Sequence, residues 1–277
     1  MTTIFDGEKL AATKLQALKK QTFPPLTIAA LVFSEDDGGQ LYTRKKSELA
    51  AQLNITYLPT QMSINTDLPI IQSWIEKQNA SPKITGLIVQ KPMRRVYEST
   101  TKRQDFAGWW ANITSHISPA KDIDGLNPAT TAVISATASA VLSVLTAIGR
   151  LKNRRWQTSE RVVIIGKSDL LGFPLHQALT KMGADVSLWG KKELASQTSS
   201  SKAIDQEIII SATGIPNLIK GSMISEGAIL IDVGEPQGDV DVPSVLNKAS
   251  FLTPVPHGIG PLTVVSLMEN AVRLANI

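Results

Sequence analysis

Tyr42 and Lys46 are the residues of this sequence with the clearest potential for acid–base chemistry. They stand four positions apart in a stretch of helix-forming composition, so their side chains share one face of the expected helix. A lysine exchanges protons near neutral pH only when burial or a nearby positive charge lowers its pKa. Arg44 and Lys45 add positive charge, although neighbouring helix positions point away from Lys46. A plain amphipathic helix with solvated cations is the alternative interpretation.

Two further segments place polar side chains at points where ligands are commonly held. Gln90 ends the apolar run 84–90, a predicted strand stopped by Pro92. Open α/β sheets present ligand-contacting groups at the carboxyl ends of their strands. Asp122 and Asp124 lie in a short turn and are candidates for hydrogen-bond acceptors. The alternatives are a polar strand cap for Gln90 and simple turn formation for the two aspartates, because further acidic positions of a calcium loop are missing.

Residues 161–174 (RVVIIGKSDLLGFP) follow a strand–glycine–helix pattern that is typical of a phosphate-binding turn. Gly166 and Gly172 flank the turn, and Lys167 and Ser168 follow the first glycine. Glycine permits close backbone approach to a phosphate, and a helix N-terminus offers free amides and a positive dipole. The middle glycine of the dinucleotide fingerprint is missing, so an ordinary strand–turn–helix stays open.

The next predicted strand ends in Trp189-Gly190-Lys191-Lys192 rather than in an acidic residue. Sites that prefer NAD usually place Asp or Glu there to hold a ribose hydroxyl. Lys191 and Lys192, together with Lys167, suit a 2′-phosphate instead. The sequence therefore predicts NADP, with NAD less favoured, and lysines that only solubilise a loop are the alternative.

Alternating strand and helix patterns surround these residues in both halves of the chain. Such alternation predicts parallel sheets with helical crossovers, and hence an α/β protein. Strands are expected at 26–33, 55–58, 84–90, 161–166, 185–189, 208–211 and 228–232, and helices at 39–53, 68–78, 137–151, 173–182 and 262–276. Residues 92–124 read as less regular, and 152–160 as a polar, basic linker.

Composition restricts the classes of protein and chemistry. The 277 residues suffice for two domains, and the absence of cysteine excludes disulfides and thiolate catalysis. With only three histidines, no metal site is predicted. Neither a secretory signal nor a long apolar run is visible, so a soluble cytoplasmic protein without membrane partners is expected. The net charge of +4 comes with several basic clusters, which are read first as solvated surface, second as sites for anionic ligands and last as nucleic-acid contacts, because none is interleaved with aromatic residues.

Four collinear segments resemble the bifunctional methylenetetrahydrofolate dehydrogenase/cyclohydrolase family of one-carbon metabolism. They are Tyr42–Lys46 (YTRKK), Gly86–Pro92 (GLIVQKP), Pro119–Gly125 (PAKDIDG) and Thr253–Thr263 (TPVPHGIGPLT), and residues 166–174 resemble the family's cofactor loop. The resemblance implies a folate-binding catalytic domain (residues 1–127 with 262–277), a Rossmann-like dinucleotide-binding domain (128–261), a cleft between them, and a homodimer. It also implies oxidation of 5,10-methylenetetrahydrofolate with NADP and hydrolysis of the methenyl product to 10-formyltetrahydrofolate.

The resemblance further implies roles for single residues. Tyr42 stacks on the folate, Lys46 is the acid/base group of hydrolysis, and Gln90 hydrogen-bonds Lys46 and helps to keep it neutral. Asp124 accepts hydrogen bonds from the pterin ring. The implied substrate contacts of the last loop are Pro256, Gly258, Gly260 and Pro261, and the implied cofactor contacts are Gly166, Lys167, Ser168, Gly172, Lys191, Lys192, Gly234 and Glu235.

Departures from the family pattern fall mostly on cofactor and cleft positions. The family's G-D-D-P-A-S is replaced by residues 34–39 (SEDDGG), without its serine, and the usual Gly-Gly of the last loop is His257-Gly258. A position that is often isoleucine, packed on the nicotinamide, is Glu235. Weaker nicotinamide binding is therefore expected. The alternatives are a cyclohydrolase with a degenerate cofactor site, a shikimate-dehydrogenase-like NADP oxidoreductase, and a non-catalytic folate-binding scaffold.

Overall fold

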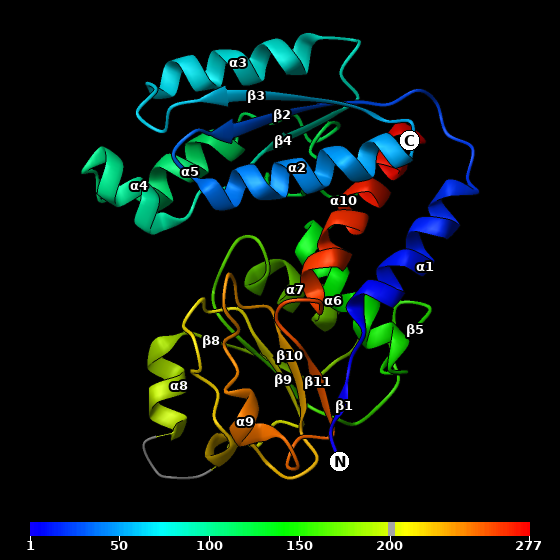
Figure 1. The fold of residues 1–277 in the computed structure, drawn as a ribbon, viewed down its shortest axis with the longest axis vertical. Helices are drawn as coiled ribbons and strands as arrows, with labels where there is room; N and C mark the ends of the chain where they lie inside the picture. The colour runs from blue at the N-terminus through cyan, green and yellow to red at the C-terminus, as the bar shows by residue number, and fades with distance from the viewer. Residues whose placement is uncertain (199–202) are drawn as a thin grey trace. The chain divides into compact units, whose positions relative to one another are not determined.

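The computed structural model describes residues 1–198 and 203–277, which form two compact units, each with its own parallel sheet (Figure 1). Unit 1 comprises Met1–Lys14 and Thr137–Thr263, and unit 2 comprises Leu15–Ala136 and Val264–Ile277. Both units combine residues from the two ends of the chain. Compared with the domains expected from the sequence, the largest difference is that the first 14 residues lie with unit 1.

Unit 2 is built on a three-stranded parallel sheet in the order β3–β2–β4. Its strands are β2 (Thr27–Phe33), β3 (Thr56–Met62) and β4 (Gly86–Val89), and its crossover helices are α2 (Asp37–Gln52) and α3 (Leu68–Ala80). Residues 28–33 of the central strand are buried, as a continuous apolar run between two neighbours predicts. The sequence therefore located all three strands and both helices.

Two helices, α4 (Arg94–Thr101) and α5 (Phe106–Thr114), occupy the stretch that the sequence indicated as irregular. That expectation was wrong. The ring of Tyr97 lies 5.2 Å from that of Phe106 and 4.7 Å from that of Trp109, measured between centroids. All three rings are buried. Short helices gain most of their stability from such packing rather than from their own propensity, so local composition did not reveal them.

The final helix, α10 (Ile259–Ala275), contributes its second half to the core of unit 2. Leu267, Met268 and Val272 are buried in one apolar cluster with residues of β2 and β4. Asn270, also buried, donates hydrogen bonds of 2.9 Å from its side-chain amide to the carbonyls of Ile123 and Ile134. The last helix is thereby tied to the segment that follows the 121–125 turn.

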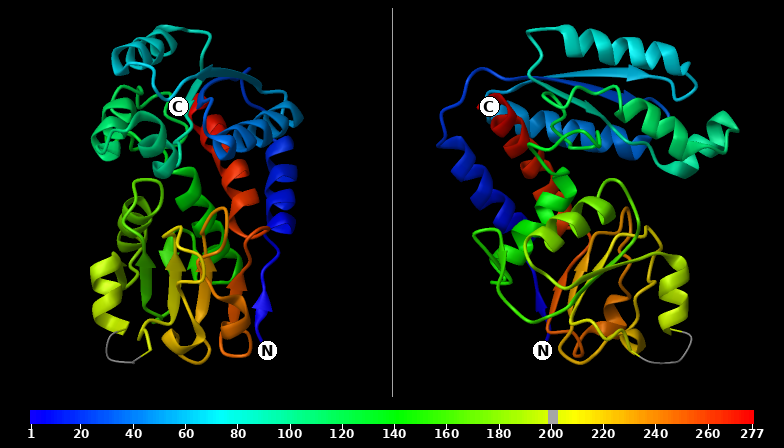
Figure 2. Two further views of the ribbon diagram at one scale, coloured as in Figure 1. Left: turned by 60° about the vertical axis from the view of Figure 1, so that its left-hand side comes forward. Right: turned by 180° about the vertical axis from the view of Figure 1, so that it is seen from behind.

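Unit 1 contains a six-stranded parallel sheet in the order β1–β11–β10–β9–β7–β8 (Figure 2). The strands are β1 (Thr3–Ile4), β7 (Val162–Ile165), β8 (Val186–Trp189), β9 (Ile208–Ser211), β10 (Ile229–Asp232) and β11 (Phe251–Thr253). The accompanying helices are α1 (Gly7–Lys19), α6 (Ala136–Ala147), α7 (Gly172–Lys181), α8 (Lys191–Thr198) and α9 (Val242–Val245). The edge strand β1 places the first residues of the chain in this sheet.

A small antiparallel hairpin replaces the linker expected over residues 152–160. Leu151–Lys152 (β5) pairs with Arg155–Trp156 (β6). The intervening Asn153 and Arg154 have φ values of 48° and 58°. Two consecutive residues at positive φ are the requirement of a tight two-residue hairpin turn, and asparagine adopts this conformation readily. Arginine is not typical of such a turn, so the sequence did not predict it.

Candidate active site

A contact between Lys46 and Gln90 marks the carboxyl end of the unit 2 sheet. Lys46, on α2, is only 5 % exposed, and its Nζ donates a hydrogen bond of 2.7 Å to Oε1 of Gln90, which follows β4. The backbone N–H of Gln90 donates to the carbonyl of Leu31 on β2 at 2.8 Å. The side-chain amide therefore sits at a fixed point beside the central strand, where it holds a buried amine.

Tyr42 lies one helical turn before Lys46 on α2 and is half-buried. The Nζ of Lys45 lies 5.5 Å from the centroid of the Tyr42 ring. Arg44 and Lys45 are exposed, whereas Lys46 is buried, so the two neighbouring cations do point away from it. Tyr42 and Lys46 share a face of the helix as their spacing predicts.

Asp36, a buried carboxyl group that the sequence analysis did not single out, lies beside this pair. It is the N-cap residue of α2 and is 2 % exposed. A Cβ atom on Gly39 would lie 2.7 Å from Oδ2 of Asp36 and 3.1 Å from Cγ of Gln90. Glycine at this position therefore lets both side chains pack against the helix. Burial raises the pKa of Asp36, against the lowering effect of backbone hydrogen bonds from Met93 and Gly39. The available signal in the sequence was an aspartate shortly before a predicted helix, where N-cap residues are typical.

Asp124 lies in a turn that is anchored to both neighbouring elements of unit 2. The N–H of Leu87 on β4 donates to the carbonyl of Lys121 at 2.7 Å. The Nζ of Lys121 donates to the carbonyls of Asn79 and Ser81, both at 2.7 Å, at the end of α3. A lysine at a helix C-terminus satisfies carbonyls that have no partner within the helix. The turn is thereby held against the sheet.

The two acidic side chains of this turn differ in their surroundings. Asp122 is buried, and its Oδ2 accepts hydrogen bonds from the N–H of Asn127 at 2.8 Å and the hydroxyl of Thr130 at 2.7 Å. Asp124 is half-buried. Burial raises the pKa of Tyr57, and the charge of Asp124 raises it further. Asp122 thus stabilises the turn, as the turn-forming alternative stated, and Asp124 presents the more accessible carboxylate.

The candidate contacts of the last loop lie in unit 1, between β11 and the start of α10. They are Pro256, Gly258, Gly260 and Pro261. A Cβ atom on Gly258 would lie 2.3 Å from the carbonyl oxygen of Pro254, so the loop tolerates only glycine there without rearrangement. The next two candidates form the first turn of α10.

His257 precedes that glycine in a left-handed conformation, with φ of 81°. Its Nδ1 lies 2.7 Å from Oε1 of Glu8, and the two side chains are 65 % and 62 % exposed. The N–H of Gly7, at the beginning of α1, donates to the His257 carbonyl at 3.0 Å. The histidine therefore joins the loop to the first helix of unit 1.

The turn from Gly166 to Gly172, which the sequence predicts to bind a phosphate, packs tightly against its own backbone and against the loop after β9. Gly166 has φ of 124°, and a Cβ atom there would lie 2.4 Å from the carbonyl oxygen of Ala212. A Cβ atom on Gly172 would lie 2.0 Å from the carbonyl oxygen of Gly166. Oγ of Ser168 accepts hydrogen bonds from the N–H groups of Leu171 (3.2 Å) and Gly172 (3.3 Å). This tight turn before α7 fits a dinucleotide phosphate.

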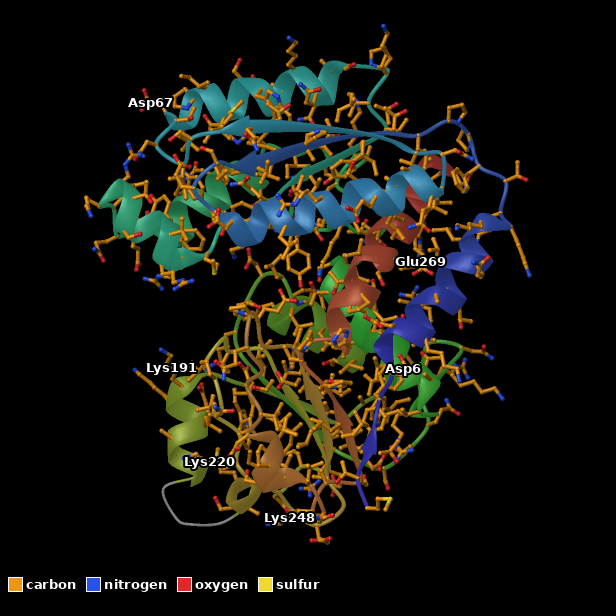
Figure 3. All side chains as sticks on the ribbon, in the orientation of Figure 1. Asp6, Asp67, Lys191, Lys220, Lys248 and Glu269 are labelled. Atoms are coloured by element: carbon orange, nitrogen blue, oxygen red, sulfur yellow. The ribbon has the colours of Figure 1, made fainter. Side chains whose placement is uncertain are left out.

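The three lysines that are predicted from the sequence to contact a 2′-phosphate have different surroundings. Lys191 and Lys192 begin α8 and are exposed, and Lys191 is labelled in Figure 3. The Nζ of Lys167 forms an ion pair of 2.5 Å with Oε1 of Glu193. The hydrogen bond from Lys167, with backbone hydrogen bonds from Glu193 itself and from Gly190, lowers the pKa of Glu193 to about 2. Glu193 was not predicted from the sequence, where the available signal was an acidic residue in the first turn of a helix.

The loop after β10 carries Gly234 and the exposed Glu235. Asp239, which ends this loop, is fully buried, and its Oδ2 accepts hydrogen bonds from the Ser211 hydroxyl (2.8 Å) and the Thr213 N–H (2.6 Å). A Cβ atom on Gly234 would lie 2.6 Å from Oδ1 of Asp239. The loops after β9 and β10 are thus fixed to each other at the carboxyl edge of the unit 1 sheet.

The candidates consequently form two groups. Tyr42, Lys46, Gln90 and Asp124 belong to unit 2, and the loop and cofactor candidates belong to unit 1. Within residues 1–198 and 203–277 no group of three or more His, Cys, Asp or Glu side chains is arranged to hold a metal ion. Over the same ranges, no helix has the length and apolar character needed to cross a membrane.

Both parts of the chain match the same protein family. Residues 5–124 match the catalytic domain of tetrahydrofolate dehydrogenase/cyclohydrolase, and residues 135–277 match its NAD(P)-binding domain. The chain belongs to this family. The family and the α/β fold class predicted from the sequence, with an N-terminal catalytic domain and a Rossmann-like NAD(P)-binding domain, are therefore confirmed.

Individual members of the tetrahydrofolate dehydrogenase/cyclohydrolase family align over the full chain. The bifunctional protein FolD of Limosilactobacillus reuteri is 32 % identical, over 99 % of this chain and 98 % of its own. The crystal structure of the bifunctional FolD enzyme from Campylobacter jejuni is similar with a TM-score of 0.80 at 26 % identity, covering 100 % of this chain and 99 % of that one. A shikimate dehydrogenase structure from Aquifex aeolicus reaches a TM-score of 0.52 at 12 % identity, covering 89 % of this chain and 91 % of its own, which is a likeness of fold alone.

Proposed function

We propose that this chain oxidises 5,10-methylenetetrahydrofolate to the methenyl compound with a nicotinamide dinucleotide, and hydrolyses the methenyl compound to 10-formyltetrahydrofolate. The observation that carries the proposal is the buried contact of 2.7 Å between Lys46 and Gln90, in a chain that matches both domains of the family. The proposal is supported by the full-length similarity to the Limosilactobacillus reuteri protein, which is named a bifunctional FolD protein, and to the Campylobacter jejuni enzyme, which is named a methylenetetrahydrofolate dehydrogenase/cyclohydrolase.

In the hydrolytic step, water adds to the methenyl carbon, which is bonded to N5 and N10 of the folate. Lys46 in its neutral form takes a proton from the attacking water and returns it to N5 as the bond between that carbon and N5 breaks. The remaining hydroxyl proton is released to solvent as the carbonyl of the formyl group forms on N10, and it carries away the positive charge of the methenyl compound. Gln90 orients the amine through the hydrogen bond to Nζ. Tyr42 packs against the folate, and Asp124 accepts hydrogen bonds from its pterin ring. Both are proposed as substrate contacts.

In the oxidative step, a nicotinamide dinucleotide held by unit 1 would supply the acceptor for the hydride of the methylene carbon, and no acid or base of the protein is required. Unit 1 contributes binding and orientation. The turn from Gly166 to Gly172 would hold the pyrophosphate, since its two glycines let the backbone pack more tightly than any side chain allows: a Cβ there would lie 2.4 Å and 2.0 Å from backbone carbonyl oxygens. The three lysines Lys167, Lys191 and Lys192 support NADP as the dinucleotide.

Absorbance measurements on the purified protein test both steps. We expect reduction of a dinucleotide when 5,10-methylenetetrahydrofolate is supplied with NADP or NAD, and accelerated loss of methenyltetrahydrofolate when no dinucleotide is present. Loss without reduction would leave a cyclohydrolase whose dinucleotide site has degenerated, and silence in both assays would refute the proposal. A homodimer and a cytoplasmic location stay predictions, which sedimentation and cell fractionation would test.

A further inference from the structure

Glu193 brings a carboxylate to the carboxyl end of β8, although the sequence directly after that strand shows only Gly190 and two lysines. The N–H of Gly190 donates to Oε2 of Glu193 at 2.8 Å. The N–H of Gly166 donates to the carbonyl of Trp189 at 2.9 Å, so the end of β8 adjoins the first glycine of the phosphate turn. In dinucleotide-binding sheets this is the place where an acidic residue holds the ribose hydroxyls of NAD.

The carboxylate of Glu193 also balances the positive charge of Lys167, which follows the first glycine of the turn from Gly166 to Gly172. Oε1 of Glu193 lies 2.5 Å from Nζ of Lys167, and the two side chains are 44 % and 40 % exposed. Both side chains pack against Gly190, because a Cβ atom there would lie 3.2 Å from Oε2 of Glu193 and 3.4 Å from Cδ of Lys167. The lysine best placed to meet a 2′-phosphate is thus already paired with a negative charge.

We propose that the Lys167–Glu193 pair determines which dinucleotide this chain prefers. Glu193 accepts hydrogen bonds from the ribose hydroxyls of NAD and repels the 2′-phosphate of NADP, whereas Lys167, with Lys191 and Lys192, attracts that phosphate. This inference rests on the proposed use of a nicotinamide dinucleotide. It predicts an enzyme that accepts both dinucleotides with weak discrimination, rather than one committed to NADP.

The size of the effect follows from the exposure of the pair. Two charges a few ångströms apart still repel or attract each other in a water-like surrounding, and the interaction grows with the number of charges on each partner. The 2′-phosphate carries more than one negative charge near neutral pH. Removing the Glu193 charge should therefore shift the ratio of NADP to NAD affinity roughly tenfold toward NADP.

The test compares Glu193→Gln with Glu226→Gln. The control removes the same charge from an exposed residue just before β10, at the opposite, amino edge of the sheet. Calorimetry gives the dissociation constants of NADP and NAD for the wild-type protein and both variants. We expect the affinity ratio to move toward NADP by roughly tenfold in Glu193→Gln only, and the shift to shrink as salt is added. Lys167→Gln should move the ratio in the opposite direction.

Three results would count against the inference. A ratio that changes less than about twofold in Glu193→Gln, or equally in Glu226→Gln, overturns it, because one charge beside the phosphate is worth more than that. A wild-type protein that binds neither dinucleotide overturns both this inference and the proposed oxidation. Dinucleotide reduction by the wild-type protein, with an unchanged ratio in Glu193→Gln, overturns the inference alone. Unfolding curves will show whether each variant is folded, since an exposed ion pair contributes little to stability.

Discussion

Replacing Gln90 by leucine isolates the contribution of one hydrogen bond to the proposed hydrolysis. The substitution keeps a side chain of similar size and removes the Oε1 atom, which accepts from Nζ of Lys46 at 2.7 Å. Because Lys46 is 5 % exposed, water does not readily take the place of this acceptor. The buried amine therefore loses this acceptor and the orientation that the acceptor gives it.

The expected loss can be worked from the type of bond. A hydrogen bond between neutral groups contributes about 0.5–1.5 kcal/mol, and each 1.36 kcal/mol of activation free energy changes a rate tenfold. If the bond acts in the rate-limiting step, kcat for hydrolysis of methenyltetrahydrofolate should fall by roughly 2- to 13-fold. Hydride transfer needs no proton at Lys46, so the dehydrogenase rate of the same sample should change by much less.

Absorbance of the methenyl compound reports hydrolysis, and absorbance of the reduced dinucleotide reports oxidation. The matched control is Gln72→Leu, which removes an amide from a half-buried position of α3 in the same unit. The reasoning is refuted if both activities of Gln90→Leu decline by one common factor, or if hydrolysis falls no further than in the control. A common decline would indicate a structural defect rather than the loss of an oriented amine.

Three further predictions concern neighbouring features. Lys46→Ala should abolish hydrolysis while sparing more of the dehydrogenase activity, and equal loss of both rates would contradict this division. His257→Gly should raise the free energy of unfolding by about 0.5–1 kcal/mol, because glycine adopts the left-handed conformation of this position without strain. Glu8→Gln removes only the exposed contact with His257 and should not raise it. Stabilisation by both variants in denaturant titrations would contradict the strain argument. Burial raises the pKa of Asp36, so the ionised carboxylate costs stability above that pKa and the cost disappears as the pH falls through it. The gain in free energy of unfolding from Asp36→Asn, relative to wild type, should therefore be largest near neutral pH. A gain that increases as the pH is lowered would contradict this prediction.

The sequence predicted the parts of the fold that depend on local apolar patterns. The central strand β2 and the cofactor strand β7 are continuous apolar runs, and both are buried where expected. Helical and strand periodicity placed Tyr42 and Lys46 on one face of a helix and Gln90 at the end of its strand. The contact between Lys46 and Gln90 that the structure shows was implied by the resemblance to the family.

The features that escaped prediction depend on contacts between distant residues. Strand β1 is two residues long and exists because it pairs with β11, whose residues lie almost 250 positions later. Helices α4 and α5 depend on a cluster of aromatic rings. Glu193 reaches the end of β8 only because α8 begins immediately after Gly190 and turns the side chain back. No local pattern in the sequence specifies contacts of this kind.

The pairing of β1 with β11 has a consequence for the order in which the protein matures on the ribosome. Strand β1 cannot pair with its neighbour until Phe251–Thr253 has been made, almost 250 residues later. The core of unit 2 likewise requires Leu267 and Val272. Folding of both units should therefore finish only after these late residues have left the ribosome.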